Sequence, residues 1–242
     1  VLSAAIACLA AGWLTEKFGR KAMMLFSSAL AALACLPICL CDGAYWPFFA
    51  GRAMQGVAAG LIGVVVPMYL AECLPARIRG KGAGMFQLLD FIGISFCALV
   101  GLAVVHVIGA VDSEGMTAAR KMLAWKTVFW SSAVPALLFF FGALGLKESP
   151  RWLFHRGRKE DALKALVAIN GEEEGKAILE EFVQADREEA EKKAALAAAA
   201  RGDSLFQRKY VLPFFISLAV LICNQAIGFN AIQYFTIPML KD

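Results

Sequence analysis

The stretch GWLTEKFGRKAM, Gly12–Met23, interrupts a segment, residues 1–41, that is otherwise almost without charge. A tight loop between two helices needs glycine where the chain turns or where helices crowd, an acid that complements a helix start, and bases that stay at the lipid headgroups. The stretch therefore predicts a short basic loop between two helices at a membrane surface. The residues that would supply these parts are Gly12, Glu16, Lys17, Gly19, Arg20 and Lys21.

The composition places the chain in a bilayer. Of its 242 residues 60% are hydrophobic and 18% charged, and the mean hydropathy is +0.63. A helix that crosses the hydrocarbon core needs roughly 20 mostly apolar residues. We therefore expect an all-α, polytopic membrane helical bundle with six spans, of which the first is cut short. The expected spans are 1–11, 22–41, 46–70, 82–111, 128–146 and 211–240.

The charge changes abruptly after Leu146, because 26 of the 44 charged residues lie between Lys147 and Lys209. This pattern predicts a transmembrane bundle at 1–146, a linker of short amphipathic helices at 147–208 and the first helix of a second bundle at 209–242. Lys and Arg accumulate in cytoplasmic loops, which puts the opening loop and the linker on the cytoplasmic side. Arg120 and Lys121, on the other side, are the exception.

Three further motifs follow the opening loop. They are GRAMQGVAAGLIGVVVPMYLAECLPARIRGKGAGMFQ at 51–87, KESPRWL at 147–153 and NQAIGFNAIQYF at 224–235. Together the four motifs resemble the sugar porter family of the major facilitator superfamily. The resemblance implies the major facilitator fold, with twelve helices in two halves. On this reading the chain is a fragment from helix two to helix seven, whose partners are the missing remainder of its own chain and the lipid bilayer.

The resemblance also implies a cytoplasmic charge network that latches the two halves together when the transporter faces outward and parts when it opens inward. The alternative is a set of solvated loop charges, each contributing ~0–1 kcal/mol. Glutamate at position 16, where the family usually has aspartate, leaves that pairing open. The residues at the network positions are Glu16, Arg20, Lys21, Glu72, Arg79, Glu148 and Arg151.

Neutral amides suit a sugar site at the bilayer midplane, because each offers donors and an acceptor without the desolvation cost of a charge. The resemblance assigns this role to Gln87 on helix five and to Gln225 and Asn230 on helix seven, with Asn224 beside them and Tyr234 at an aromatic gate. The alternative is helix packing through amide bonds. Asn224 stands where the family commonly has a second glutamine, which weakens glucose in particular as the substrate.

Two ionisable residues lie inside the spans. Asp90, three residues after Gln87 where the family usually has an apolar residue, would bind a sugar hydroxyl, carry a proton in symport, or pair locally with another group. Arg52 matches an arginine that pairs with a helix-one aspartate in proton-coupled members. A co-transported proton is therefore the one cofactor that we consider, and we expect no metal.

These observations predict transport of a monosaccharide, a hexose, by alternating access, as uniport or proton symport, in a multi-pass protein of the plasma membrane. Two alternatives stay open: transport of another solute, such as a cyclitol or an organic acid, and a non-transporting sugar sensor. We expect that the protein is not an enzyme, because no group of nucleophilic, basic or metal-binding residues lies at one depth in the spans. The net charge of +4 reflects membrane topology, and nothing in it indicates a nucleic acid partner.

Overall fold

The computed structural model describes residues 1–41, 44–109 and 117–198, together with positions 211, 215, 216, 218, 219, 222 and 223, and these residues contain helices and no strand. The chain divides into two compact units, Val1–Val183 and Gln184–Asp242. Helices α1 to α9 lie in the first unit. The domain boundaries predicted at 146 and 208 stay predictions.

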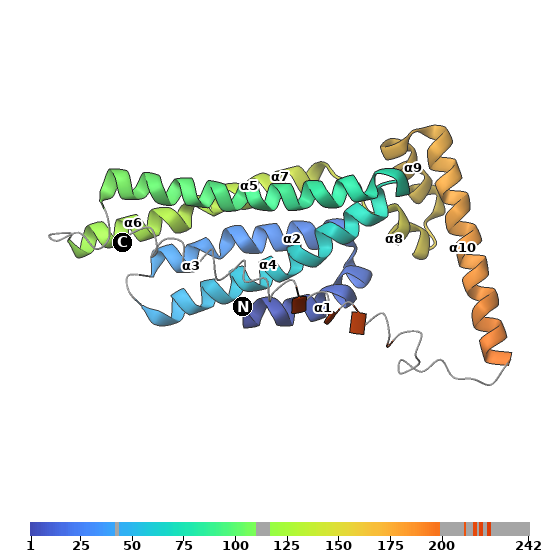
Figure 1. Cartoon of the computed structure of the whole chain (residues 1–242), viewed down its shortest axis with the longest axis horizontal. Helices are drawn as coiled ribbons and strands as arrows, with labels where there is room; N and C mark the ends of the chain where they lie inside the picture. Colours follow the sequence, from blue (N-terminus) through green and yellow to red (C-terminus); the bar gives the residue numbers. More distant parts are fainter. Residues whose placement is uncertain are drawn as a thin grey trace. The chain divides into compact units, whose positions relative to one another are not determined.

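The helices α1 to α7 form a bundle in which α3 continues from α2 and α7 continues from α6 (Figure 1). Four stretches within them are long and apolar enough to cross a membrane: Arg20–Leu40, Tyr45–Cys73, Gly80–Ile108 and Ala118–Gly145. The helices are α1 (Leu2–Phe18), α2 (Arg20–Leu33), α3 (Cys35–Leu40), α4 (Tyr45–Cys73), α5 (Ala76–Ile108), α6 (Ala118–Ser131) and α7 (Ala133–Gly145).

Two of the four spans contain a break, and both breaks have the same cause. The first separates α2 from α3 at Ala34, and the second separates α6 from α7 at Ser132. A proline follows each break by three residues, and a proline ring removes one helical hydrogen bond and crowds the carbonyl one turn before it. The two breaks are adjacent in space, because Cys35 Sγ lies 3.4 Å from Ser132 Oγ.

Helix α4 is the centre of the packing, with α1 and α2 against it. The buried core between these helices includes Met24, Leu61 and Val65. The approach of α1 to α4 is close at Gly60, where a Cβ atom would collide with the carbonyl oxygen of Ala4. Glycine lets two membrane helices approach this closely, and their packing then rests on van der Waals contact.

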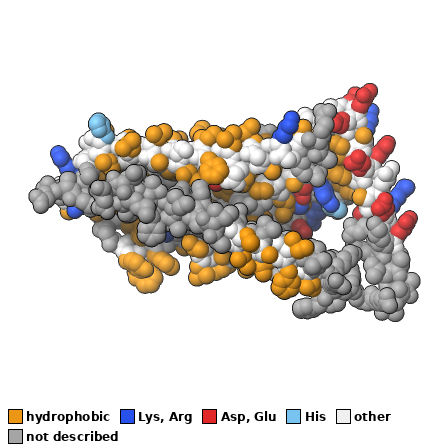
Figure 2. Space-filling view, in the orientation of Figure 1, with side chains coloured by type: hydrophobic (Ala, Val, Ile, Leu, Met, Phe, Trp, Pro, Cys, Tyr) orange, Lys and Arg blue, Asp and Glu red, His pale blue; other side chains and the backbone are white. Residues whose placement is uncertain are grey.

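Helix α5 has a different environment. In the apolar 18-residue window of the Gly80–Ile108 span only 6% of the residues are buried, against 44% in the corresponding window of Arg20–Leu40. It contacts α6 and α4, and most of its described side chains are exposed. Figure 2 shows hydrophobic side chains along the sides of the bundle and charged side chains towards its ends.

Three further helices follow α7: α8 (Pro150–His155), α9 (Lys159–Asn170) and α10 (Glu172–Ala198). Leu153 and Phe154 of α8 pack on Ala162 and Ala165 of α9, and Phe182 of α10 covers this small core. A hydrogen bond from Lys176 holds the pKa of the exposed Glu172 carboxyl, at the start of α10, below its ordinary value.

The predicted fold class is confirmed, and several predicted boundaries are wrong. The fifth span begins at Ala118 and not at residue 128. The prediction placed its start too late because the first turns of α6 carry three basic residues, Arg120, Lys121 and Lys126. The predicted linker of short helices contains, besides α8 and α9, the 27-residue helix α10, which is longer than expected. The span predicted at 211–240 lies largely outside the described residues.

Candidate functional site

The loop between α1 and α2 consists of one residue, Gly19, with φ +95° and ψ 164°. This backbone conformation is essentially restricted to glycine. Gly12 lies inside α1, with nothing within 4 Å of the position of its missing side chain, so neither a turn nor crowded helices explain this glycine. The sequence predicted that Glu16 complements the start of α2. In the structure Glu16 lies in the last turn of α1 and does not do so.

The acid that complements the start of α2 comes from much later in the chain. Glu148 accepts hydrogen bonds from the backbone N–H groups of Arg20 and Lys21, at 2.8 and 3.0 Å. A carboxylate at this place satisfies helix N–H groups that have no partner inside the helix and complements the positive end of the helix dipole. A Cβ atom at Gly19 would collide with this carboxylate, so the glycine also makes room for Glu148.

Arg20 and Glu72 form a buried two-point ion pair next to this contact. Arg20 Nε donates to Glu72 Oε2 at 2.9 Å, and Nη2 donates to Oε1 at 2.7 Å. The two side chains are 10% and 11% exposed. Ser149 Oγ, which is fully buried, donates to the same carboxylate at 2.6 Å. The pair therefore joins the start of α2 to the end of α4 and to the residue before α8.

Helix α8 also holds the end of α1. Trp152 Nε1 donates to the carbonyl oxygen of Glu16 at 2.8 Å, and Arg156 Nη2 donates to the carbonyls of Glu16 and Lys17, both at 2.9 Å. The Arg156 guanidinium lies 5.3 Å from the Trp152 ring centre. These donors satisfy carbonyl groups that have no partner inside the helix. We name the set Arg20, Glu72, Glu148, Ser149, Trp152 and Arg156 the junction cluster.

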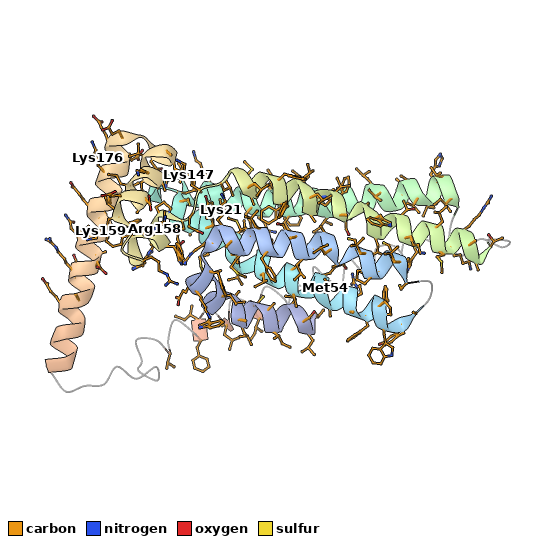
Figure 3. All side chains as sticks on the ribbon, turned by 180° about the vertical axis from the view of Figure 1, so that it is seen from behind. Lys21, Met54, Lys147, Arg158, Lys159 and Lys176 are labelled. Carbon is orange, nitrogen blue, oxygen red and sulfur yellow. The ribbon has the colours of Figure 1, made fainter. Side chains whose placement is uncertain are left out.

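Two lysines border the junction cluster and are labelled in Figure 3. Lys21 Nζ donates to the carbonyl oxygen of Leu144, near the end of α7, at 2.9 Å. The backbone carbonyl of Lys147 accepts a hydrogen bond from the Tyr69 hydroxyl of α4, also at 2.9 Å. Together with the junction cluster, these hydrogen bonds join the ends of α1, α2, α4 and α7 to one another or to the region around α8.

An open cavity of about 740 Å3 lies beside the junction cluster. Arg151 lines it with an exposed side chain, and in the described part of the chain that side chain has no hydrogen bond or ion pair. The side chain of Arg79, the remaining member of the predicted network, lies outside the described side chains. The residues that line the cavity are Trp13, Glu16, Lys17, Arg20, Glu72, Arg151, Trp152, His155 and Arg156.

The predicted substrate residues on α5 lie next to each other. Gln87 Nε2 is 3.5 Å from Asp90 Oδ2, at the outer limit of a hydrogen bond, and both side chains are exposed. Residues three apart on a helix share a face. The predictions on helix seven, at Asn224, Gln225, Asn230 and Tyr234, lie outside the described residues.

Arg52 of α4 has a local environment. Its Nη1 donates to Gln55 Oε1 at 2.9 Å, and its guanidinium lies 5.6 Å from the ring centre of Phe129. The family resemblance implies an aspartate of helix one as the partner of Arg52, and this aspartate is not among the described residues. A role for Arg52 in proton coupling stays a prediction.

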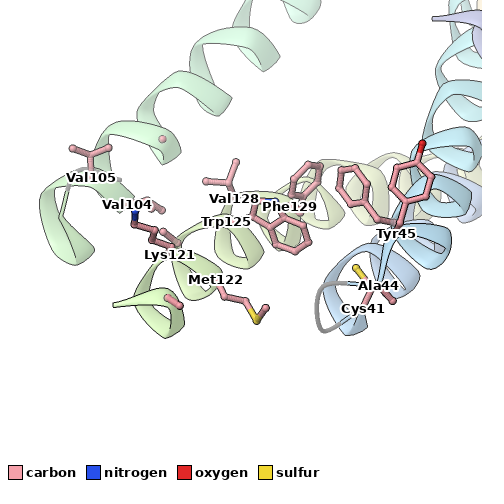
Figure 4. A pocket seen from close by; sticks show the side chains of 14 residues that line it. Cys41, Ala44, Tyr45, Val104, Val105, Lys121, Met122, Trp125, Val128 and Phe129 are labelled. Atoms are coloured by element: carbon pink, nitrogen blue, oxygen red, sulfur yellow. The ribbon is translucent and has the colours of Figure 1, made fainter. Parts of the chain in front are cut away.

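A second open cavity, of about 850 Å3, lies at the opposite end of the bundle between α4, α5 and α6 (Figure 4). It is apolar, and Trp125, which stacks on Phe48 with ring centres 5.8 Å apart, is part of its wall. Lys121 is the one charged residue in its lining. None of the predicted site residues lines this cavity, so it gives no support to the predicted sugar site.

Sequence reasoning missed Ser149, Trp152 and Arg156. A signal for Ser149 was present, since serine directly before proline is typical of a helix start, and its Oγ accepts from the N–H of Trp152. No local signal marks Arg156, because its two carbonyl partners lie 139 and 140 positions earlier in the chain.

These features define an integral membrane protein whose helices are joined at one end by a buried charge cluster. A sequence model of the family described as "Sugar (and other) transporter" matches residues 1–242. The chain belongs to this family, and its fold is that of the major facilitator superfamily, in part.

The similar proteins transport several kinds of solute. The chain is 30% identical to the major myo-inositol transporter of Bacillus subtilis, covering 100% of this chain and 48% of that protein. It is 29% identical to the arabinose-proton symporter of the same organism (95% and 46%), and 31% identical to the quinate permease of Neurospora terricola (81% and 35%). The chain thus spans about half the length or less of these relatives.

Two solved structures show the same fold. The proton:xylose symporter XylE bound to 6-bromo-6-deoxy-D-glucose has a TM-score of 0.76 and 23% identity, over 97% of this chain and 50% of that one. The partially occluded, inward-open xylose transporter XylE from E. coli has a TM-score of 0.66 and 25% identity, over 77% and 47%.

Proposed function

We propose that this chain forms part of a transporter that moves a monosaccharide, a hexose, across a membrane by alternating access. The observation that carries the proposal is the polar pair Gln87–Asp90 in the middle of the apolar helix α5, in a chain that belongs to the sugar transporter family. Polar and ionisable groups are costly inside a bilayer, and they mark substrate or ion pathways. Gln225 and Asn230, together with Asn224 and Tyr234, would complete the site from helix seven.

The substrate and the coupling mode are part of the same proposal. The relatives' names include myo-inositol, arabinose and quinate, so a cyclitol or an organic acid is the main alternative to a hexose. A non-transporting sugar sensor is the second alternative. Because one relative is a proton symporter, we keep both uniport and proton symport. We place the protein in the plasma membrane, with the junction cluster and the linker in the cytoplasm.

Replacing Gln87 by alanine removes two donors and one acceptor from the proposed site. We expect the KM for the transported sugar to rise by about tenfold, which corresponds to about 1.4 kcal/mol. Surface expression should be unchanged, because the side chain is exposed on α5. The measurement is initial uptake rate against sugar concentration in cells that express the full-length protein.

Ser95→Ala is the matched control for this change. Ser95 lies on the same helix and its hydroxyl donates only to the carbonyl of Phe91, 2.9 Å away, within the described residues. If Gln87→Ala and Ser95→Ala had the same KM as the unaltered protein, Gln87 would not bind the sugar.

The geometry of the junction cluster suggests two different roles for the predicted gate residues. Arg20, Glu72 and Glu148 pair with one another or with helix ends inside this bundle, so we propose that they hold its cytoplasmic end rigid. Arg151 and Glu16 line the open cavity with exposed side chains. We assign to these two the reversible contacts with the other half of the transporter.

Arg151→Ala should therefore slow the transport cycle and leave sugar binding nearly intact. We expect kcat for uptake to fall about tenfold while the Kd for the sugar, measured on purified protein, changes less than twofold. Lys164→Ala is the control, because Lys164 is an exposed lysine of α9 that lies 4.0 Å from the Asp161 carboxylate of the same helix. A normal uptake rate for Arg151→Ala would contradict the gate role.

A further inference from the structure

Asp90 is the one acidic residue of Gly80–Ile108, a span that is long and apolar enough to cross a membrane. A carboxylate in this position is stable only where it faces water or polar partners, because its transfer into hydrocarbon is costly. The face of α5 that carries Asp90 therefore points to a wet or polar space in the assembled protein and not to lipid.

The surroundings of Asp90 on α5 leave room for a ligand. Gly84, Gln87, Asp90 and Gly93 follow one another at intervals of three residues, and residues at this interval form a continuous row on a helix. A Cβ atom at Gly84 or Gly93 would meet nothing within 4 Å. The polar pair is thus bordered at both ends by positions without side chains, and no described residue covers it.

The pair has unused hydrogen-bonding capacity. The contact from Gln87 to Asp90 is long, at 3.5 Å, and is the one hydrogen bond of Asp90 in the described part of the chain. An ionised carboxylate accepts only, through two oxygens, and the neighbouring amide both donates and accepts. Two adjacent hydroxyl groups, as in a sugar or a cyclitol, match the carboxylate as paired donors. A substrate carboxylate placed there would meet a like charge, which opposes binding.

We propose that Asp90 binds a hydroxyl pair of the substrate and makes the transporter select neutral polyols over polyols that carry a carboxylate. This inference rests on the proposed function, because it places a substrate at the α5 face. It divides the solutes named among the relatives: arabinose and myo-inositol fit beside Asp90, and quinate does not. Asp90 is then a specificity-determining residue.

The test uses the full-length protein in transporter-deficient cells, with labelled glucose, myo-inositol and quinate as separate probes. The unaltered protein should take up a neutral polyol, and excess quinate should not compete. Asp90→Asn keeps the size and removes the charge. It should raise the KM for the neutral polyol by about tenfold to a hundredfold, as loss of a hydrogen bond to a charged group does, and quinate should now compete.

Two further variants separate charge from folding. Asp90→Glu keeps the charge and should keep the exclusion of quinate, even where its longer side chain raises the KM. Ser95→Ala should change neither quantity. Surface expression is measured for each variant, and if Asp90→Asn does not reach the surface, the comparison of Asp90→Glu with the unaltered protein still tests the exclusion of quinate.

The outcomes are distinguishable. Uptake of a neutral polyol that is unchanged in Asp90→Asn, with quinate still excluded, would overturn the role of Asp90 and leave the proposed function standing. Uptake of quinate by the unaltered protein, as fast as of a neutral polyol, would also overturn it. Uptake of none of the probes would contradict the proposed function itself and this inference with it.

Discussion

Arg20→Ala is expected to lower the free energy of unfolding of the protein by about 3–5 kcal/mol, because it leaves the buried carboxylate of Glu72 without its counter-charge. Glu72 would keep only the hydrogen bond from Ser149. Arg20 also donates to the carbonyl oxygen of Thr15 at 3.2 Å, so the end of α1 loses a contact as well. The measurement is thermal or denaturant unfolding of the purified full-length protein in detergent.

Lys17→Ala is the control for this change. Lys17 has an exposed side chain whose amine lies 5.0 Å from the ring centre of Trp13, an arrangement that contributes about 0.5–1 kcal/mol. The double variant Arg20→Ala with Glu72→Ala should be less destabilised than the sum of the single variants, since it leaves no unpaired charge. Equal effects of Arg20→Ala and Lys17→Ala would show that the ion pair contributes little.

Gly19→Ala has the second large expected effect. The backbone conformation at Gly19, φ +95° and ψ 164°, costs any other residue about 1–3 kcal/mol. The new methyl group would also displace the carboxylate of Glu148 and break its contacts with the N–H groups of Arg20 and Lys21. We expect lower stability and little uptake, measured on the same preparations as Arg20→Ala.

Gly12→Ala provides the matched comparison, because it is the same substitution at the other glycine of the opening motif. Gly12 lies within α1, and a Cβ atom there has open space. Alanine favours a helix by up to about 1 kcal/mol relative to glycine, so this variant should be as stable as the unaltered protein or more so. Similar losses in Gly12→Ala and Gly19→Ala would contradict the role of Gly19.

Much of the fold could be predicted because the bilayer imposes long apolar helices that are visible as uninterrupted segments. Tyr45–Cys73 and Gly80–Ile108 were predicted within a few residues. The predicted boundaries were wrong where the end of a span is polar, as at Ala118. The breaks at Ala34 and Ser132 were not predicted, because an apolar composition does not indicate where a proline kinks a helix.

The candidate site was only partly predictable, for a physical reason. The sequence indicated that Glu16 serves the start of α2, since it is the nearest acid, and the structure gives this position to Glu148, more than a hundred residues later. Long-range pairings of this kind depend on which helix ends meet, and no local pattern encodes that. The contact between Gln87 and Asp90 was predictable, because side chains three positions apart on a helix lie on the same face.

The measurement that tests the central claim most directly is uptake of labelled glucose, fructose and myo-inositol into transporter-deficient cells that express the full-length gene, with and without a proton gradient. The account predicts saturable uptake of at least one of these neutral polyols, either dependent on the gradient or independent of it. Uptake of none of them, with the protein confirmed at the cell surface, would contradict the account.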